Sequence, residues 1–196
     1  MKTEKEKMLA SEYYIPWDDT LTADREKAKD LLFELNNTAP SKREERKKII
    51  EELMPSLAGK DHWIESPFGC DYGYNIKAGK NFYTNTNCTL LDGAEIIIGD
   101  DVLFGPNVSL YTPNHAFDAE ERKQGYEQAL PIVIGDNVWL GGSVTIVGGV
   151  TIGKNTIIAA GSVVTKDIPE NVLAAGVPCK VLRPITKEDK RCYIEN

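Results

Sequence analysis

Residues 132–168 read IVIGDNVWLGGSVTIVGGVTIGKNTIIAAGSVVTKDI, and this stretch decides the fold. Within it an aliphatic residue recurs at every sixth position: Ile134, Leu140, Ile146, Ile152, Ile158 and Val164. Four residues after each comes a second series of small or aliphatic residues: Val138, Val144, Val150, Thr156, Ser162 and Ile168. A period of six is neither the 3.6 of an amphipathic helix nor the strict alternation of a strand. It predicts a chain that turns the same corner every six residues, as in β-helical solenoids built on hexapeptide repeats.

Glycines follow three members of the first series, at Gly135, Gly141 and Gly153. Glycine suits a corner that needs an unusual φ or that brings stacked backbones close together. More units fit upstream, at Ile98, Phe104 and Leu110, with a weaker set at Ile76, Phe82 and Cys88 and a slip of phase around LLDGAE between them. A β-sandwich would instead need turn signals about every 8–12 residues without a fixed phase. We therefore expect a mainly β fold, a parallel β-helix.

The composition of the whole chain excludes several classes of protein. The 196 residues are 41% hydrophobic and 27% charged, with a formal net charge of −7, which argues against nucleic acid as the main partner. Its apolar runs are far too short to cross a bilayer, and the opening MKTEKEKMLASEYY has no apolar core of a secretory signal. We expect a cytoplasmic protein without a membrane partner. Its four cysteines have no metal-site spacing and are expected to be reduced, structural thiols: Cys70, Cys88, Cys179 and Cys192.

Three parts are expected along the chain. Residues 1–60 are helical: Leu31 and Leu35 share one face with their neighbours Ala28 and Leu32, and Asn36–Asn37 offer a stop. Ser41 and Glu44 read as a capping box that opens the next helix, whose apolar face ends before Pro55 and Gly59. A shorter helix is expected near residues 3–12. Residues 61–184 form the β-helix, with a protruding loop at 111–131, and residues 185–196 form a C-terminal tail. The helices and the extended segment after Val164 are candidates to cover the open ends of the coil.

The long loop holds the best candidate for chemistry. His115 lies in TPNHAFD, and a loop histidine can act as a general base because its ordinary pKa is roughly 6.5. His62, the other histidine, has no acidic or nucleophilic neighbour in sequence and reads as structural. No serine or cysteine lies in a nucleophile-elbow context, and two distant histidines do not make a zinc site, so no metal is expected.

Several strings together resemble one family. The loop NHAFD, GDNVWLGG and AAGSVVTKDIPENVLAAGVPCKVLR are similar to the hexapeptide-repeat (left-handed β-helix) acyltransferases. TEKEKMLASE, GCDYGYNI and NFYTNTN resemble more narrowly the maltose and galactoside O-acetyltransferases. The resemblance covers residues 3 to about 184. It implies a homotrimer that transfers acetyl from acetyl-CoA directly to a hydroxyl of a mono- or disaccharide or a glycoside.

The resemblance also implies roles for individual residues. His115 would be the general base and Asn85 would orient the acceptor hydroxyl, although an asparagine is also an ordinary occupant of a β-helix corner. The acceptor would meet Asp71, Tyr83, Asn85 and Asp92. Next to Asp92 some relatives carry a second aspartate where this chain has Gly93. Pro16 lies near the place of an N-terminal acidic residue, and Asp18 and Asp19 are the candidates to substitute for it.

Acetyl-CoA would bind in a groove between subunits. The residues that match the donor site are Trp139, Gly142, Ala160, Thr165, Lys166, Lys180 and Arg183. Small residues let the pantetheine arm approach the backbone, and an amide near Gly142 would donate to the developing oxyanion. Trp139 could equally pack between subunits. The alternatives left open are another hydroxylated acceptor (an antibiotic or serine), a non-catalytic scaffold, and a zinc enzyme of the same fold.

Overall fold

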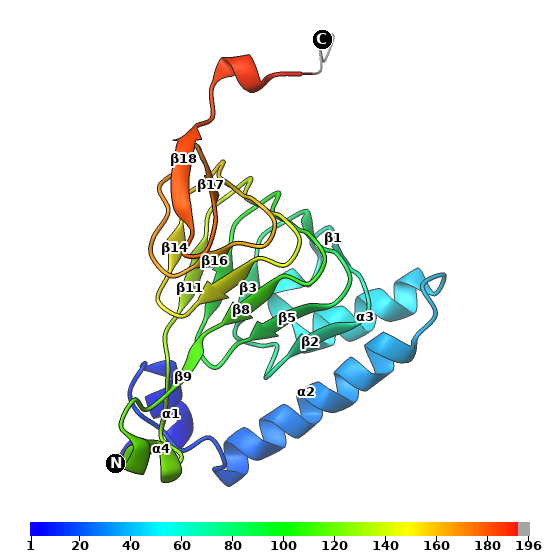
Figure 1. The fold of residues 1–196 in the computed structure, drawn as a ribbon. Coiled ribbons are helices and arrows are strands. Elements are labelled where there is room, and N and C mark those ends of the chain that lie inside the picture. The colour runs from blue at the N-terminus through cyan, green and yellow to red at the C-terminus, as the bar shows by residue number, and fades with distance from the viewer. Residues whose placement is uncertain (192–196) are drawn as a thin grey trace.

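The computed structural model describes residues 1–191, and they form a left-handed parallel β-helix of three sheets with helices below it (Figure 1). Sheet 1 contains β1 (His62–Ile64), β4 (Phe82–Thr84), β7 (Leu103–Phe104), β12 (Trp139–Leu140), β15 (Ile157–Ile158), β17 (Val172–Ala175) and β18 (Lys180–Pro184). Sheet 2 contains β2 (Phe68–Cys70), β5 (Cys88–Leu91), β8 (Ser109–Tyr111), β13 (Thr145–Val147) and β16 (Val163–Val164). Sheet 3 contains β3 (Ile76–Ala78), β6 (Ile96–Ile98), β11 (Ile132–Ile134) and β14 (Thr151–Ile152). The chain visits sheets 1, 2 and 3 in turn, so the fold has three edges, which we call 1–2, 2–3 and 3–1.

Both six-residue series point into the prism, as the period predicts. Members of the first series are at most 1% exposed and those of the second at most 5%. The two polar members are satisfied by backbone carbonyls: Thr156 Oγ1 donates to Pro169 O (2.9 Å) and Ser162 Oγ to Ala159 O (2.6 Å). Each inward residue stacks on its equivalent in the next coil, which makes one continuous core.

The weaker upstream set, Ile76, Phe82 and Cys88, belongs to the second inward series, the one that continues with Val138 and Val144. Ile76 pairs with Ile96, and it is Ala78 that pairs with Ile98 of the first series. Equivalent positions of these early coils lie 20 residues apart, as in the Asn81–Asp101 hydrogen bond, whereas the later Asn137–Asn155 bond spans 18. The slip of phase therefore comes from two extra residues in the early coils.

The corner glycines are explained by close approach and not by an unusual φ. A Cβ on Gly141 would lie 2.5 Å from Ala160 N, and one on Gly153 would lie 2.3 Å from Glu170 N. The left-handed φ occurs two residues later, at Asn137 (56°), Ser143 (59°) and Asn155 (57°). Asparagine tolerates this region, and its side chains form ladders between coils.

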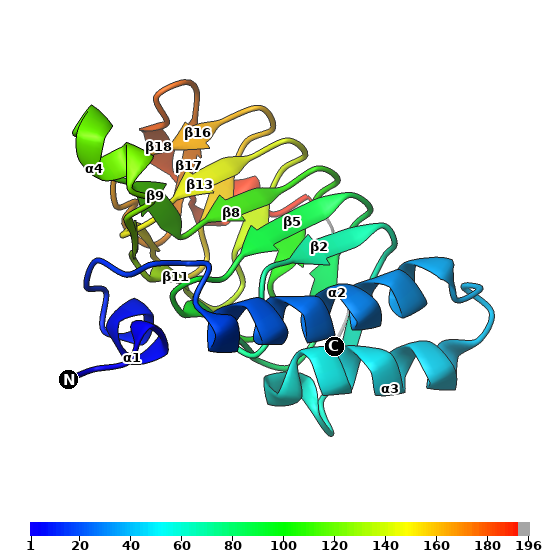
Figure 2. The same cartoon turned by 90° about the horizontal axis from the view of Figure 1, so that it is seen from below.

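Helices cover the first coil. They are α1 (Glu4–Leu9), α2 (Asp19–Asn37), α3 (Arg43–Leu53) and the short 3-10 helix η1 (Pro55–Leu57). Figure 2 shows α2 and α3 crossing beneath the coil, and their buried faces join its core. The expected helices and the stop at Asn37 are confirmed. The Ser41–Glu44 capping box is wrong, because α3 begins at Arg43 and has no side-chain cap.

One buried arginine joins these helices to the coil. Arg46 is 5% exposed, and its guanidinium donates to Leu35 O (2.9 Å), Thr38 O (3.1 Å) and Ile64 O (2.9 Å). Leu35 and Thr38 lie at the end of α2, whose last carbonyls have no partner within the helix. Arg46 therefore caps α2 and fixes it to β1.

At the other end of the coil, β18 pairs antiparallel with β17 and leads into the tail that leaves the prism (Figure 1). A 3-10 helix, η2 (Lys187–Asp189), follows. Cys70, Cys88 and Cys179 are free thiols, and Cys192 lies outside the described residues.

Candidate active site

The coil is irregular along one edge. On edge 2–3 the chain makes longer turns at residues 71–75 and 92–95, and then the long loop at residues 112–131. The loop is a small hairpin of β9 (Pro113–His115) and β10 (Glu127–Ala129), with α4 (Ala119–Lys123) between them. These turns are stacked, and the N-terminal segment passes beside them. Edge 2–3 is therefore where a pocket can form.

A pocket of about 380 Å³ lies at this edge. It is lined by Tyr14, Pro16, Arg25, Asp71, Tyr72, Leu91, Pro113, His115 and Glu127. The lining comes from the N-terminal segment, α2, the turn after β2, β5 and the loop hairpin, so distant parts of the sequence meet here. Of the expected site residues, it brings together His115 and Asp71.

His115 ends β9, and its side chain is 64% exposed toward solvent. The hairpin register places Glu127 opposite it, and Nδ1 of His115 lies 3.7 Å from Glu127 Oε1. The sequence analysis missed Glu127, because it treated the loop as a segment without pattern. The pairing of residues 12 positions apart becomes visible only once the loop folds as a hairpin.

Asp71 faces the same pocket as a half-buried carboxylate. Burial raises its pKa, while the nearby Arg25 guanidinium acts in the opposite direction. No group within residues 1–191 donates a hydrogen bond to this carboxylate. Across from it, Arg25 Nη1 donates to Tyr72 Oη (2.7 Å). The Asp71 carboxylate therefore offers acceptor oxygens to a ligand in the pocket, and Arg25 offers further N–H donors.

Asp92 does not face the pocket. It is fully buried, and its carboxylate accepts the backbone N–H groups of Asp71 (3.0 Å), Tyr72 (2.8 Å) and Asn75 (3.2 Å). Burial raises the pKa of Asp92 to about 6, although these N–H donors favour the charged form. In place of the expected direct contact with an acceptor, Asp92 fixes the turn that presents Asp71. Next to it, a Cβ on Gly93 would lie 3.2 Å from Ala129 Cβ.

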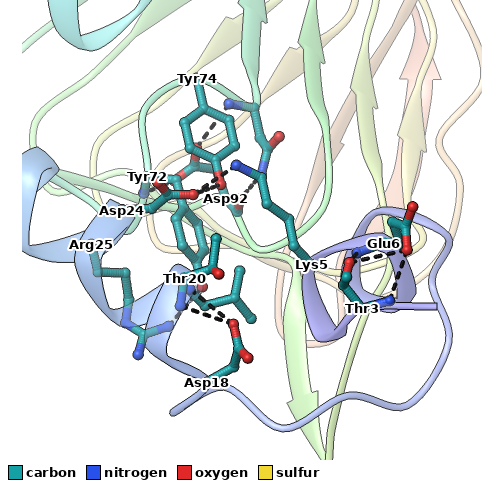
Figure 3. A network of polar contacts seen from close by, with 12 residues as sticks. Thr3, Lys5, Glu6, Asp18, Thr20, Asp24, Arg25, Tyr72, Tyr74 and Asp92 are labelled. Atoms are coloured by element: carbon teal, nitrogen blue, oxygen red, sulfur yellow. Dashed lines mark hydrogen bonds and ion pairs between the residues drawn. The ribbon is translucent and has the colours of Figure 1, made fainter. Parts of the chain in front are cut away.

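Figure 3 shows how the N-terminal elements hold the pocket wall. Asp24 of α2 accepts from Lys5 Nζ (2.7 Å) of α1 and from Tyr74 Oη (2.9 Å) of the 71–75 turn. Asp18 caps α2 by accepting the N–H groups of Thr20 and Leu21, and Asp19 is exposed in its first turn. Of the three N-terminal positions considered for the acceptor, only Pro16 lines the pocket.

Three of the other expected residues lie on edge 1–2, away from this pocket: Asn85, Gly142 and Ala160. Asn85 follows β4, and its Oδ1 accepts the N–H of Thr86 (2.8 Å). Gly142 and Ala160 follow β12 and β15 at the same edge, and no backbone carbonyl of the described residues accepts from the Gly142 N–H. Tyr83 and Trp139 point outward from sheet 1, and Trp139 is 50% exposed. One chain therefore carries these residues and His115 on different edges.

The expected residues near the CoA phosphates are divided too. Thr165 and Lys166 follow β16 on edge 2–3, whereas Lys180 and Arg183 lie on β18. Arg183 is engaged: its guanidinium donates to both carboxylate oxygens of Asp189 (2.6 and 2.8 Å), which lowers the pKa of Asp189 to about 2. A phosphate that bound Arg183 would have to compete with this carboxylate.

His62 lies far from the pocket, at the start of β1. Its Nδ1 is 3.0 Å from Lys60 O, and burial lowers its pKa. Within residues 1–191 no cluster of three or more His, Cys, Asp or Glu side chains could hold a metal ion. No helix in the same range is long and apolar enough to span a membrane.

Two family models match the chain. The maltose acetyltransferase hexapeptide capping motif matches residues 7–59, and the bacterial transferase hexapeptide model of six repeats matches residues 131–166. The first match covers α2, α3 and η1, the helices that lie under the coil. The second covers nearly the whole stretch with the six-residue period.

Curated proteins and solved structures match over almost the full length. The galactoside O-acetyltransferase of Escherichia coli (strain K12) is 44% identical over 191 residues, which cover 97% of this chain and 94% of that protein. The crystal structure of a maltose O-acetyltransferase from Clostridium difficile 630 is 47% identical, with a TM-score of 0.92 over 95% of this chain and 99% of that one. A galactoside acetyltransferase in complex with coenzyme A is 43% identical, with a TM-score of 0.92 over 100% and 98% of the two chains.

Proposed function

This chain belongs to the hexapeptide-repeat acetyltransferases that include the maltose and galactoside O-acetyltransferases, and we propose that it acetylates a sugar hydroxyl from acetyl-CoA with His115 as general base. The observation that carries the proposal is the pocket on edge 2–3. It joins an exposed imidazole, the carboxylate of Asp71 and the guanidinium of Arg25. A sugar offers hydroxyl groups that can donate to the imidazole of His115 and to the carboxylate of Asp71, and that can accept from the guanidinium of Arg25.

The reaction is a direct transfer. The His115 imidazole takes the proton from the acceptor hydroxyl as its oxygen attacks the thioester carbonyl of acetyl-CoA. The new C–O bond forms, the C–S bond breaks, and the imidazolium returns the proton to the CoA thiolate. Asn85 supports the hydroxyl or the transition state. No acyl-enzyme is needed, because the base and the two substrates meet in one site.

The donor site is proposed on edge 1–2 and the end of the coil. The small residues Gly142 and Ala160 leave room for the pantetheine arm, and the free N–H of Gly142 suits the developing oxyanion. Trp139 covers the thiol end of the arm. The phosphates and adenine would meet the remaining expected residues, Thr165, Lys166, Lys180 and Arg183. Solved relatives in complex with coenzyme A or acetyl-CoA support this co-substrate.

A homotrimer would complete the site. His115 and Asn85 lie on different edges of one chain, so a second chain has to supply one of them. Sheet 1 also carries an outward ladder of apolar side chains that pair in register between coils: Trp63, Tyr83, Leu103, Trp139, Ile157 and Leu173. Leu103 and Trp139 at its centre are about half exposed, and an apolar stripe that reaches solvent in this way is typical of a protein interface. The closed symmetry of a trimer would bury it in every subunit.

The first test is acetyl-CoA consumption with a panel of sugars, glycosides, amino acids and hydroxylated antibiotics. His115→Ala should lower kcat by about 1,000-fold or more, with the affinity for acetyl-CoA unchanged. Asp71→Asn should raise the acceptor KM about 10-fold and leave the donor KM as it is. His62→Gln is the matched control, because it changes the other histidine and should turn over normally. Normal turnover in His115→Ala would refute the general base.

The shared site has its own test. Asn85→Ala and His115→Ala are both expected to be inactive alone. When equal amounts of the two are unfolded and refolded together, the refolded mixture should regain about a quarter of the wild-type activity, since random assembly places the two intact edges at one interface at that frequency. No recovery in mixed trimers verified by mass would show that both residues act from the same chain.

A further inference from the structure

The base of the loop hairpin holds a carboxylate against the proposed base. Glu127 lies directly opposite His115 in the β9–β10 register, and its side chain is only 18% exposed. One of its oxygens, Oε1, lies 3.7 Å from His115 Nδ1. The other, Oε2, accepts a hydrogen bond from Tyr14 Oη (3.0 Å). The two oxygens thus face two different partners.

Tyr14 is fixed from all sides. Its side chain is 2% exposed, and its backbone pairs with that of Glu127 through Tyr14 N to Glu127 O (2.9 Å) and Glu127 N to Tyr14 O (3.1 Å). Burial and the neighbouring Glu127 charge raise the pKa of the phenol, so it keeps its proton and acts as a donor. Gln128 Nε2 adds a bond to Ser11 O (2.8 Å). The N-terminal segment therefore braces the hairpin that carries His115.

We propose that Glu127 is a positioning residue for His115, and that Tyr14 holds Glu127 in place. The proposal rests on the proposed function of His115 as base. The carboxylate keeps the imidazole proton on Nδ1, so that Nε2 is free to accept the proton of the acceptor hydroxyl. As that proton arrives, the ring becomes an imidazolium, which Glu127 stabilises until the proton leaves with the CoA thiol.

The separation in this structure is longer than a hydrogen bond. It has to shorten to about 2.8 Å, the usual length of a charge-assisted N–H···O bond, when acceptor and donor are bound. The antiparallel pairing of β9 and β10 keeps the two residues opposite each other, so side-chain rotation is sufficient. The ionisable groups that share the pocket with His115 are Tyr14, Arg25, Asp71, Tyr72 and Glu127. Among them Glu127 forms the one ion-pair contact with His115 within residues 1–191.

The test uses the protein labelled with ¹⁵N-histidine, in which signals come from only two imidazole rings because the chain has two histidines. The His115→Ala spectrum assigns them. In the wild type, His115 should be the Nδ1–H tautomer when neutral. In Glu127→Gln the Nε2–H tautomer should gain population, kcat should fall about 10- to 100-fold, and the pH profile of kcat/KM should change.

Tyr14→Phe provides a second variant that keeps the carboxylate and removes its anchor. It should shift the same signal in the same direction, with a kcat loss of about 3- to 10-fold. Glu121→Gln, which removes a carboxylate from α4 of the same loop, is the matched control and should change neither the signal nor kcat. A purely structural role for Glu127 would lower stability without changing the tautomer of His115.

The outcomes distinguish the role of His115 as general base from the role of Glu127 as its positioning residue. If His115→Ala is inactive while Glu127→Gln and Tyr14→Phe keep the wild-type tautomer and kcat, His115 remains the proposed base and the positioning role of Glu127 is overturned. If His115→Ala turns over normally, both are overturned. If Glu127→Gln does not fold, the signal of Tyr14→Phe decides alone.

Discussion

The coil at residues 132–168 and the stacked turns of edge 2–3 follow opposite rules. In the coil every sixth residue meets the same surroundings, so one requirement (an inward aliphatic side chain) is repeated many times. On edge 2–3 each turn has a different length, and each side chain meets a unique set of neighbours. The repeat therefore specifies the architecture, while the turns that interrupt the repeat carry the candidate active-site residues.

The largest effect is expected when the longest interruption of the repeat, the loop at residues 112–131, is removed. Leu130 N donates to Thr112 O (2.9 Å), so the two ends of the loop are already in contact. Replacing residues 114–128 by Asn-Gly should abolish turnover, at least about 1,000-fold, because His115 is lost. The melting temperature should fall by only about 5 °C, since the coil core is untouched. Calorimetry and the acetyl-CoA assay check both; collapse of the fold would show that the loop is part of the core.

The reverse experiment damages the repeat and leaves the site alone. Leu140 is fully buried in the first series, so Leu140→Ala should cost about 3 kcal/mol of unfolding free energy through lost burial and a cavity. The acceptor KM of the remaining folded enzyme should not change. Urea denaturation followed by kinetics below the transition measures the two effects. A changed acceptor KM at full folding would contradict the separation of core and pocket.

A third prediction concerns Asp92, which belongs to the irregular edge but is buried like a core residue. Its pKa is about 6 in the folded protein and 3.8 ordinarily, so the folded state binds a proton more tightly between these values. The contribution of this group to stability is therefore present below pH 3.8 and is lost as the pH rises through about 6. Relative to Asp92→Asn, the wild type should lose about 2–3 kcal/mol between pH 4 and 7. Denaturation curves at several pH values measure this difference in unfolding free energy, with Asp100→Asn as the control. A difference that does not change with pH would show that the pKa of Asp92 is not raised.

The smallest expected effect tests the corner ladder. Asn155 has a φ of 57° and donates to Asn171 Oδ1 (3.0 Å). Asn155→Ala should cost about 1 kcal/mol, because alanine loses the bond and is less tolerant of this φ. Asn155→Gly should cost less, since glycine accepts the backbone conformation. Thermal unfolding of the pair separates the two causes; equal losses would assign the whole effect to the hydrogen bond.

The same comparison explains what could be predicted from sequence. The β-helix, the inward series and the helices with buried Leu32 and Leu35 followed from periodicity, because many positions repeat one signal. The pocket did not, because its residues are far apart in the chain and follow no period. His115 was found through its loop and the family resemblance. Glu127 needed the hairpin register, and the burial of Asp92 needed the fold of the 71–75 turn.

Each detour on edge 2–3 closes on itself before the chain re-enters the prism, as the contact between Thr112 and Leu130 shows for the longest one. Edge 2–3 can therefore carry inserted segments of different length and sequence. A segment of different length or charge can be grafted between these two residues without altering the register of β8 and β11. A change in the length or charge of this segment would alter the pocket, while the hexapeptide coil beneath it would keep its register.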